Sequence, residues 1–176
     1  MIRITGGEFR SRLLKTPSCD TTKPTMDKVR LGVFSAIGDK IVQANVLDLF
    51  AGCGSYGFES LSRGASSATF VDNNSEPILV IKDNAKTLGL NVDAYLGNVV
   101  TFLKESNNKF DIIFVDPPYK LVNYQEIIDL VLENNILTDF GIIVLESELP
   151  LNIKEEQFQK VKIYKYGLAK VYILRK

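Results

Sequence analysis

Residues 46–57, with the sequence VLDLFAGCGSYG, decide the fold. An apolar run from Val46 to Phe50 leads into Gly52, Gly54 and Gly57, which have GxGxxG spacing. A strand, a glycine-rich turn and a helix are expected here, because glycines permit a tight turn and the close approach of a ligand. The N-terminus of the helix adds free N–H groups. The stretch therefore predicts a unit that binds a nucleotide-like cofactor.

Strands and helices alternate beyond this unit, and the strand cores are continuous apolar runs, as in a parallel sheet covered on both faces. The strands are expected at Val46–Phe50, Ala68–Asp72, Val92–Leu96, Phe110–Val115 and Gly141–Glu146, and the helices at Tyr56–Arg63, Ser75–Leu88, Val99–Lys104 and Tyr124–Asn134. Phe158–Tyr166 and Lys170–Leu174 then predict a terminal antiparallel hairpin around Gly167-Leu168. The fold class is thus α/β, with a Rossmann-like, seven-stranded, mostly parallel sheet.

One domain is expected over residues 1–176, with a short basic N-terminal extension (1–40) before a catalytic core (41–176). The extension is expected to contain a short strand at Ile2–Ile4, a loop over residues 10–24, and a helix that starts with Thr25 as its N-cap and stops near Gly38.

The composition excludes several kinds of chemistry. The chain has no histidine, which removes Ser-His-Asp and Cys-His catalysis and imidazole-based metal sites, and no metal is expected. Cys19 and Cys53 are only two and lie far apart, which fits a reducing cytosol better than a disulfide framework. No apolar run approaches membrane-spanning length, and the first residues lack a signal peptide. A cytoplasmic monomer is expected.

The net charge is zero, but the charges are unevenly distributed. Residues 1–30 hold seven basic and three acidic side chains. A phosphate-contacting surface and a merely solvated N-terminus explain this pattern about equally well. The candidate RNA-binding residues are Arg10, Arg12, Lys15, Lys23, Lys28 and Arg30.

Two acids beside the glycine motif identify the kind of cofactor. Asp72, at the end of the second strand and followed by Asn73, is placed to accept hydrogen bonds from ribose hydroxyls. This fits both a nicotinamide dinucleotide and S-adenosylmethionine. Asp48, an acid inside the motif, suits a cofactor with an ammonium group, which it could engage directly or through water. Together with the antiparallel hairpin, Asp48 favours S-adenosylmethionine.

The tetrapeptide Asp116-Pro117-Pro118-Tyr119 ends the fourth expected strand. A proline-rich turn is the plain reading of such a sequence in isolation. Beside a methyl donor, however, Asp116 and the Pro117 carbonyl can accept both N–H bonds of a planar amine, and Tyr119 can stack on its ring. The tetrapeptide therefore predicts methyl transfer to the amine of a nucleobase that has left its stack.

These motifs together resemble the RsmD-like family of bacterial 16S rRNA guanine-N2 methyltransferases. The resemblance rests on ITGGEFR (4–10), LKTP (14–17), KPTMDKVR (23–30), DLFAGCGSYG (48–57), Glu59 to Ala65 and DPPY (116–119). It implies a seven-stranded methyltransferase fold with an N-terminal extension. It also implies one guanine of small-subunit rRNA as the substrate, within the 30S subunit or an assembly intermediate.

The candidate site has a cofactor part and a catalytic part. The cofactor-binding candidates are Asp48, Phe50, Gly52, Gly54, Gly57, Asp72, Asn73 and Asn98, and the catalytic candidates are Asp116, Pro117 and Tyr119.

Two positions depart from the family pattern. Asn98 stands where the family usually has an acid that would accept from the adenine amine, and Ser11 stands where the family tends to have glycine. The alternatives are a DNA adenine-N6 methyltransferase, a methyltransferase of protein side-chain amides, and a non-catalytic ribosome-assembly factor with the same fold. Intact Asp116, Pro117 and Tyr119 argue against the last of these.

Overall fold

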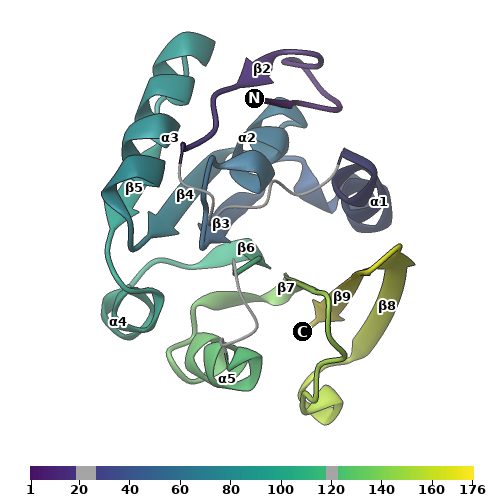
Figure 1. Ribbon diagram of the computed structural model, residues 1–176. Coiled ribbons are helices and arrows are strands. Elements are labelled where there is room, and N and C mark those ends of the chain that lie inside the picture. Colours follow the sequence, from purple (N-terminus) through teal and green to yellow (C-terminus); the bar gives the residue numbers. More distant parts are fainter. Residues whose placement is uncertain (19–26, 118–122) are drawn as a thin grey trace.

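A computed structural model describes residues 1–18, 27–117 and 123–176. Its middle layer is a seven-stranded sheet with the strand order β5-β4-β3-β6-β7-β9-β8 (Figure 1). The strands are β3 (Asn45–Leu49), β4 (Ser67–Asp72), β5 (Asp93–Leu96), β6 (Phe110–Val115), β7 (Leu137–Ser147), β8 (Lys160–Tyr166) and β9 (Ala169–Arg175). Strands β3 to β7 are parallel, whereas β9 is antiparallel to both β7 and β8. The predicted sheet and its terminal hairpin are confirmed.

Helices cover both faces of this sheet, which explains why the central strands are apolar on both sides. The helices are α1 (Asp27–Ile37), α2 (Ser55–Ser62), α3 (Ser75–Leu88), α4 (Val99–Glu105) and α5 (Tyr124–Glu133), with short 3-10 turns at Gly38–Ile41 and Glu155–Gln157. Helices α1, α2 and α3 bury their apolar side chains in one core, and α4 and α5 bury theirs in the other.

Alternation along β6 shows how one strand serves both cores. Ile112 and Phe114 lie in the core under α1, α2 and α3, whereas Ile113 and Val115 lie in the core under α4 and α5. Each of these four side chains is at most 1% exposed. The buried strand ends at Val115, so the residues that follow it emerge at the carboxyl edge of the sheet, where open α/β folds bind their ligands.

The N-terminal extension forms its own small sheet. Strands β1 (Ile2–Arg3) and β2 (Leu13–Leu14) pair antiparallel and lie over α2 and α3 (Figure 1). The sequence predicted only a loop where β2 lies. The predicted N-cap Thr25 lies outside the described residues, in which α1 begins at Asp27.

The remaining boundaries differ from prediction by a few residues, except in β7. This strand begins at Leu137, four residues before the predicted Gly141, because Leu137 pairs with Phe110; a register shift separates this pair from the regular pairing that starts at Ile112 and Ile142. In the described ranges, no helix combines the length and apolarity needed to cross a membrane.

Candidate active site at the carboxyl edge of the sheet

The glycine loop joins β3 to α2 through backbone conformations that favour glycine. Gly52 and Gly54 have φ values of 54° and 78°, and Phe50 also has a positive φ of 59°. Gly57 is needed for a different reason, because a Cβ atom there would lie 2.2 Å from the ring of Phe70 on β4. Turn geometry and close helix–sheet packing thus explain the GxGxxG spacing.

Two carboxylates hold this loop in place. Asp48 accepts a hydrogen bond from the Gly57 N–H, and Asp72 accepts one from the Gly52 N–H, each at 2.9 Å. Asp72 also accepts from the Asn74 N–H at 2.9 Å. Burial, which outweighs the opposing effect of the Gly57 hydrogen bond, and the nearby Asp72 together raise the pKa of Asp48 to about 8. The acids predicted to contact a cofactor therefore also build the loop.

A cleft of about 220 Å³ opens beside the loop at the carboxyl edge. Its lining combines an aromatic ring, apolar side chains, amides and one carboxylate, from the loops that follow β3 and β4 and from the N-terminal ends of α4 and α5. The lining residues are Phe50, Asn73, Asn98, Val99, Val100, Asn123, Glu126 and Ile127. Three predicted cofactor residues, Phe50, Asn73 and Asn98, are thus brought together. An aromatic face with hydrogen-bonding amides is the lining that a nucleoside requires, so these residues fit the adenosine end of S-adenosylmethionine.

Asn98 also caps helix α4. Its side-chain oxygen accepts from the N–H groups of Val100 at 2.8 Å and Thr101 at 3.3 Å. Asparagine is among the preferred residues at this position, which gives a structural reason for Asn98 besides the predicted contact with adenine. Its second polar group, the side-chain –NH₂, is a donor that an aspartate would lack.

The predicted catalytic residues Asp116 and Pro117 follow β6 directly and are half-buried at the same edge. Tyr119 lies outside the described residues. Asp116 lies close enough to the phenols of Tyr56 and Tyr124 to raise the pKa of both, although burial is the larger cause for each. Asp116 is therefore surrounded by side chains from α2 and α5.

Sequence reasoning missed three residues of this edge. The Tyr56 hydroxyl donates to Glu146 Oε2 at 2.8 Å, and the Tyr124 hydroxyl donates to the backbone oxygen of Glu146 at 2.6 Å. The signal was present in the sequence, because Glu146 ends a predicted strand and Tyr56 lies inside the glycine motif.

The basic residues of the extension divide into exposed and buried ones. Arg10, Arg12, Lys15 and Lys28 are exposed, as a contact with RNA requires, and the Lys15 ammonium pairs with Asp83 of α3. Lys23 lies outside the described residues.

Ser11, between the two arginines, has a φ of 71°. It thus keeps the left-handed conformation that glycine favours, and its N–H donates to the Ile4 oxygen at 2.9 Å. Serine therefore occupies this position in the backbone conformation that glycine would adopt.

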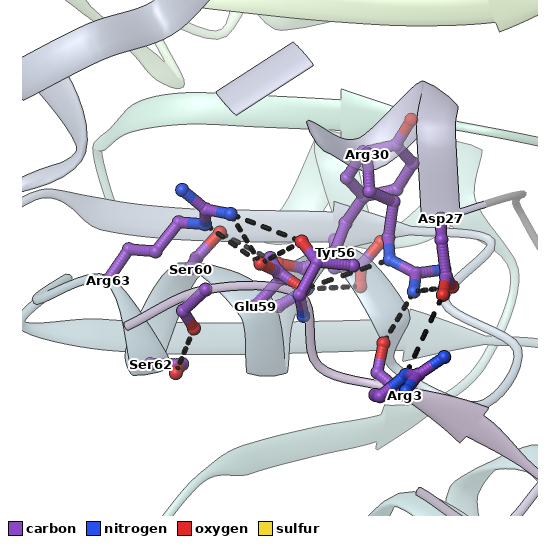
Figure 2. Close-up of polar contacts among 12 residues, drawn as sticks. Arg3, Asp27, Arg30, Tyr56, Glu59, Ser60, Ser62 and Arg63 are labelled. Atoms are coloured by element: carbon purple, nitrogen blue, oxygen red, sulfur yellow. Dashed lines mark hydrogen bonds and ion pairs between the residues drawn. The ribbon is translucent and has the colours of Figure 1, made fainter. Parts of the chain in front are cut away.

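The prediction that Arg30 binds RNA is wrong. Its side chain is 1% exposed and faces inward (Figure 2). It donates to Asp27 at 2.7 Å and to the Arg3 oxygen at 2.6 Å, and it lies 3.8 Å from Glu59. Arg30 is therefore a structural residue that joins α1, β1 and α2.

Glu59 is the centre of this buried network, and its side chain is 0% exposed. It accepts from Arg63 at 2.8 Å, from the Thr5 N–H at 2.8 Å and from the Thr5 hydroxyl at 2.7 Å (Figure 2). Ser62 adds a bond to the Gly6 oxygen at 2.6 Å. The network fixes the extension to α2, the helix that begins at the glycine loop.

Among residues 1–18, 27–117 and 123–176, no three His, Cys, Asp or Glu side chains gather in a way that could hold a metal ion. Cys53 is buried in the glycine loop, and burial raises the pKa of its thiol to about 11, which leaves it protonated at neutral pH.

The sheet with its antiparallel hairpin, the glycine loop held by two acids and the adjoining nucleoside cleft define a Rossmann-like, S-adenosylmethionine-dependent methyltransferase. Comparison with known proteins then identifies the family. The chain belongs to the family described as conserved hypothetical protein 95, which matches residues 2–175. This confirms the resemblance to RsmD-like proteins.

Two relatives and one solved structure illustrate the family. The chain is 37% identical to the ribosomal RNA small subunit methyltransferase D of Escherichia coli (strain K12) over 149 residues, which cover 84% of this chain and 75% of that protein. The protein of the same name from Haemophilus influenzae is 34% identical over 152 residues, or 84% and 79% of the two chains. The solved structure of yhhF from Escherichia coli superposes with a TM-score of 0.86 and 31% identity, covering 99% and 97%.

Proposed function

We propose that this protein transfers a methyl group from S-adenosylmethionine to the exocyclic N2 amine of one guanine in small-subunit (16S) rRNA. The observation that carries the proposal is the position of Asp116-Pro117, half-buried at the end of β6 and beside the strand that leads into the glycine loop. An amine held there would lie next to the methyl donor. The relatives named small-subunit rRNA methyltransferases support RNA as the substrate.

Guanine N2 as the acceptor has further support from a more distant protein. A structure named as the Thermus thermophilus 16S rRNA N2 G1207 methyltransferase RsmC, in complex with AdoMet and guanosine, superposes with a TM-score of 0.74 over 99% of this chain and 49% of that chain. At 21% identity this likeness supports a shared fold. That such a fold serves guanine N2 in one protein makes the same chemistry reasonable here.

One group of site residues would bind the cofactor, and the other would bind the guanine. Phe50, Asn73 and Asn98 would hold the adenosine of the cofactor, and Asp72 its ribose. The cofactor supplies a methyl group on a cationic sulfur. In this arrangement Asp48 lies on the α2 side of the loop, where the ammonium end of the bound cofactor would favour its ionised form and pair with it.

Asp116 and the Pro117 carbonyl would accept the two N–H bonds of the guanine amine. The amine lone pair is delocalised into the ring, and two acceptors in fixed positions favour a tetrahedral nitrogen whose lone pair points toward the methyl group. Positive charge grows on this nitrogen during transfer, and the carboxylate stabilises it. The surplus amine proton then passes to Asp116 or, through it, to water. Tyr119 would stack on the base.

The partner would be the small ribosomal subunit or an intermediate in its assembly, approached by the protein as a cytoplasmic monomer. The exposed Arg10, Arg12, Lys15 and Lys28, together with Lys23, would contact phosphates. Shape and ribosomal proteins would supply the remaining recognition, which is consistent with a net charge of zero.

Incubation with labelled S-adenosylmethionine tests this function directly. Small subunits from a strain that lacks the gene, free 16S rRNA and duplex DNA would be offered in parallel. Label is expected in the RNA of the small subunits, and mass spectrometry of the digested RNA should find N2-methylguanosine at one position. Label in DNA alone, or at adenine N6, would instead favour the DNA adenine methyltransferase.

A further inference from the structure

A second carboxylate lies beside Asp116 at the carboxyl edge of the sheet. In the parallel pair β6 and β7, Val115 is the partner of Leu145, so Asp116 and Glu146 follow at the same level on neighbouring strands. Both come two residues after side chains of the core under α1, α2 and α3, namely Phe114 and Val144. By the alternation of extended chains, Asp116 and Glu146 point toward this same side.

Two phenols fix the position of Glu146. Tyr56 donates to its carboxylate at 2.8 Å, and the ring of Tyr56 stacks on Phe114 with 4.5 Å between centroids and 13° between planes. Tyr124 of α5 donates to the Glu146 backbone oxygen at 2.6 Å. The pKa of each phenol is raised, first by burial, so both remain donors at neutral pH. Glu146 is therefore held on two sides at the end of its strand.

Asp116 and Glu146 place two carboxylate acceptors at the same level of neighbouring strands. A ligand that presents two donors along one edge would match these acceptors. Guanine has such an edge, because its N1–H lies directly beside its N2 amine. Adenine has an amine beside N1 as well, but its N1 is an acceptor and would be repelled by a second carboxylate.

We propose that Glu146 is a specificity-determining residue that accepts a hydrogen bond from the N1–H of the target guanine while Asp116 and the Pro117 carbonyl hold the N2 amine. This inference rests on the proposed function, since it assigns a role within the same reaction. It gives a physical reason why a site with an Asp-Pro-Pro-Tyr sequence selects guanine, because Asp116 and Pro117 alone would accept an amine on either purine.

Tyr56 acts here as a positioning residue. It belongs to the first turn of α2, directly after the glycine loop, and its hydroxyl orients the Glu146 carboxylate. The helix that the cofactor loop leads into therefore also orients the residue that would read the base.

The test uses small subunits reconstituted with rRNA that carries either guanine or 2-aminopurine at the position mapped by mass spectrometry. 2-Aminopurine keeps the exocyclic amine at C2 but has an acceptor at N1. The full-length enzyme is expected to prefer guanine by about tenfold or more in kcat/KM, as for a site built to bind a donor that the analogue lacks. Equal rates on the two subunits would overturn the role of Glu146 and leave guanine-N2 methylation standing. Failure to methylate the guanine-containing subunits would overturn the proposed function itself.

A variant sharpens this comparison. In Glu146→Gln the side-chain amide can donate to N1 of 2-aminopurine, so the preference for guanine should fall to about threefold or less, mainly through slower reaction of guanine. Asp139→Asn is the matched control, because Asp139 lies on the same strand at its opposite end and its side chain is 89% exposed. The control should keep the full preference. A Glu146→Gln enzyme that also keeps the full preference for guanine would contradict the proposal. If this variant does not fold, the proposal is still tested by the rates of the unaltered enzyme on the guanine and 2-aminopurine subunits.

Discussion

Glu59 belongs to helix α2 and Glu146 is bonded to Tyr56 of the same helix, yet the partners of the two glutamates differ. Glu59 is 0% exposed and lies between the guanidinium groups of Arg30 and Arg63. Glu146 is half-buried, bonded to the neutral Tyr56, and lies next to another acid, Asp116. The difference separates two uses of a carboxylate. One is neutralised within the fold, whereas the other lies at an edge where a donor-rich ligand can bind.

The energetic reason concerns desolvation. A buried charge is tolerated only where partners replace the water that it loses, and removal of one partner exposes the full cost. The network of Glu59 therefore contributes to folding and to the attachment of the N-terminal extension. Asp116 and Glu146 lie half-buried at the edge where the substrate would bind, so changes there should affect turnover more than stability.

The largest effect is expected on stability, from Glu59→Ala. It would leave Arg30 and Arg63 without their shared carboxylate and should destabilise the protein by about 3–5 kcal/mol. Urea unfolding measures this, with Asp139→Asn as an exposed control that should change stability by less than about 0.5 kcal/mol. Similar losses in both variants would show that the buried network of Glu59 contributes no more to stability than an exposed acid does.

The second largest effect is expected on turnover, from the replacement of Asp116. Asp116→Ala should lower kcat by about 10²- to 10³-fold, because it removes an acceptor that stabilises charge developing on the amine. Its unfolding midpoint and its binding of S-adenosylmethionine, measured by calorimetry, should stay close to those of the unaltered enzyme. Asp116→Asn keeps one side-chain acceptor, so its kcat should lie between those of the unaltered enzyme and of Asp116→Ala. Turnover by Asp116→Ala at the unaltered rate would refute the proposed catalytic role.

Most of the fold could be predicted from the sequence because its signals are local. The apolar runs, the glycine spacing at 52, 54 and 57, and the break at Gly167-Leu168 each depend on neighbours in the chain. The short pair β1–β2 and the early start of β7 could not be predicted in this way. Their strands depend on pairing with distant residues, as between Ile2 and Leu14 or Phe110 and Leu137.

The site was predictable in part for the same reason. Asp48, Asp72 and Asp116 follow or interrupt buried strands, which fixes their location at one edge of the sheet. Arg30 shows the limit of this reasoning. A basic residue in a basic segment looks solvated, and only the approach of α2 in three dimensions shows that Glu59 neutralises it.

Asp48 combines features of both glutamates, since it is 2% exposed like Glu59 but has the acid Asp72 nearby. Burial raises its pKa to about 8, so its contribution to stability is present in full below the unfolded pKa of 3.8 and is lost as the pH rises through about 8. Between pH 6 and pH 9 this group should cost the cofactor-free protein about 3 kcal/mol, which Asp48→Asn should avoid. Thermal unfolding across this range measures both proteins, and parallel curves would show that Asp48 does not titrate there.

The smallest effect is expected at Arg10 and Arg12, which are exposed whereas Arg30 is buried, and it concerns binding to the small subunit. If both contact phosphates, their joint replacement by alanine should weaken binding to small subunits only several-fold but lower the slope of log affinity against log salt by about 1.5. Replacement of the equally exposed Lys104 and Lys109, which lie near the opposite face of the sheet, should leave the slope unchanged. A slope that responds equally to both pairs would mean that the whole surface attracts RNA diffusely. A response confined to Arg10 and Arg12 would show that the extension, attached to α2 through Glu59, is the surface that meets the RNA.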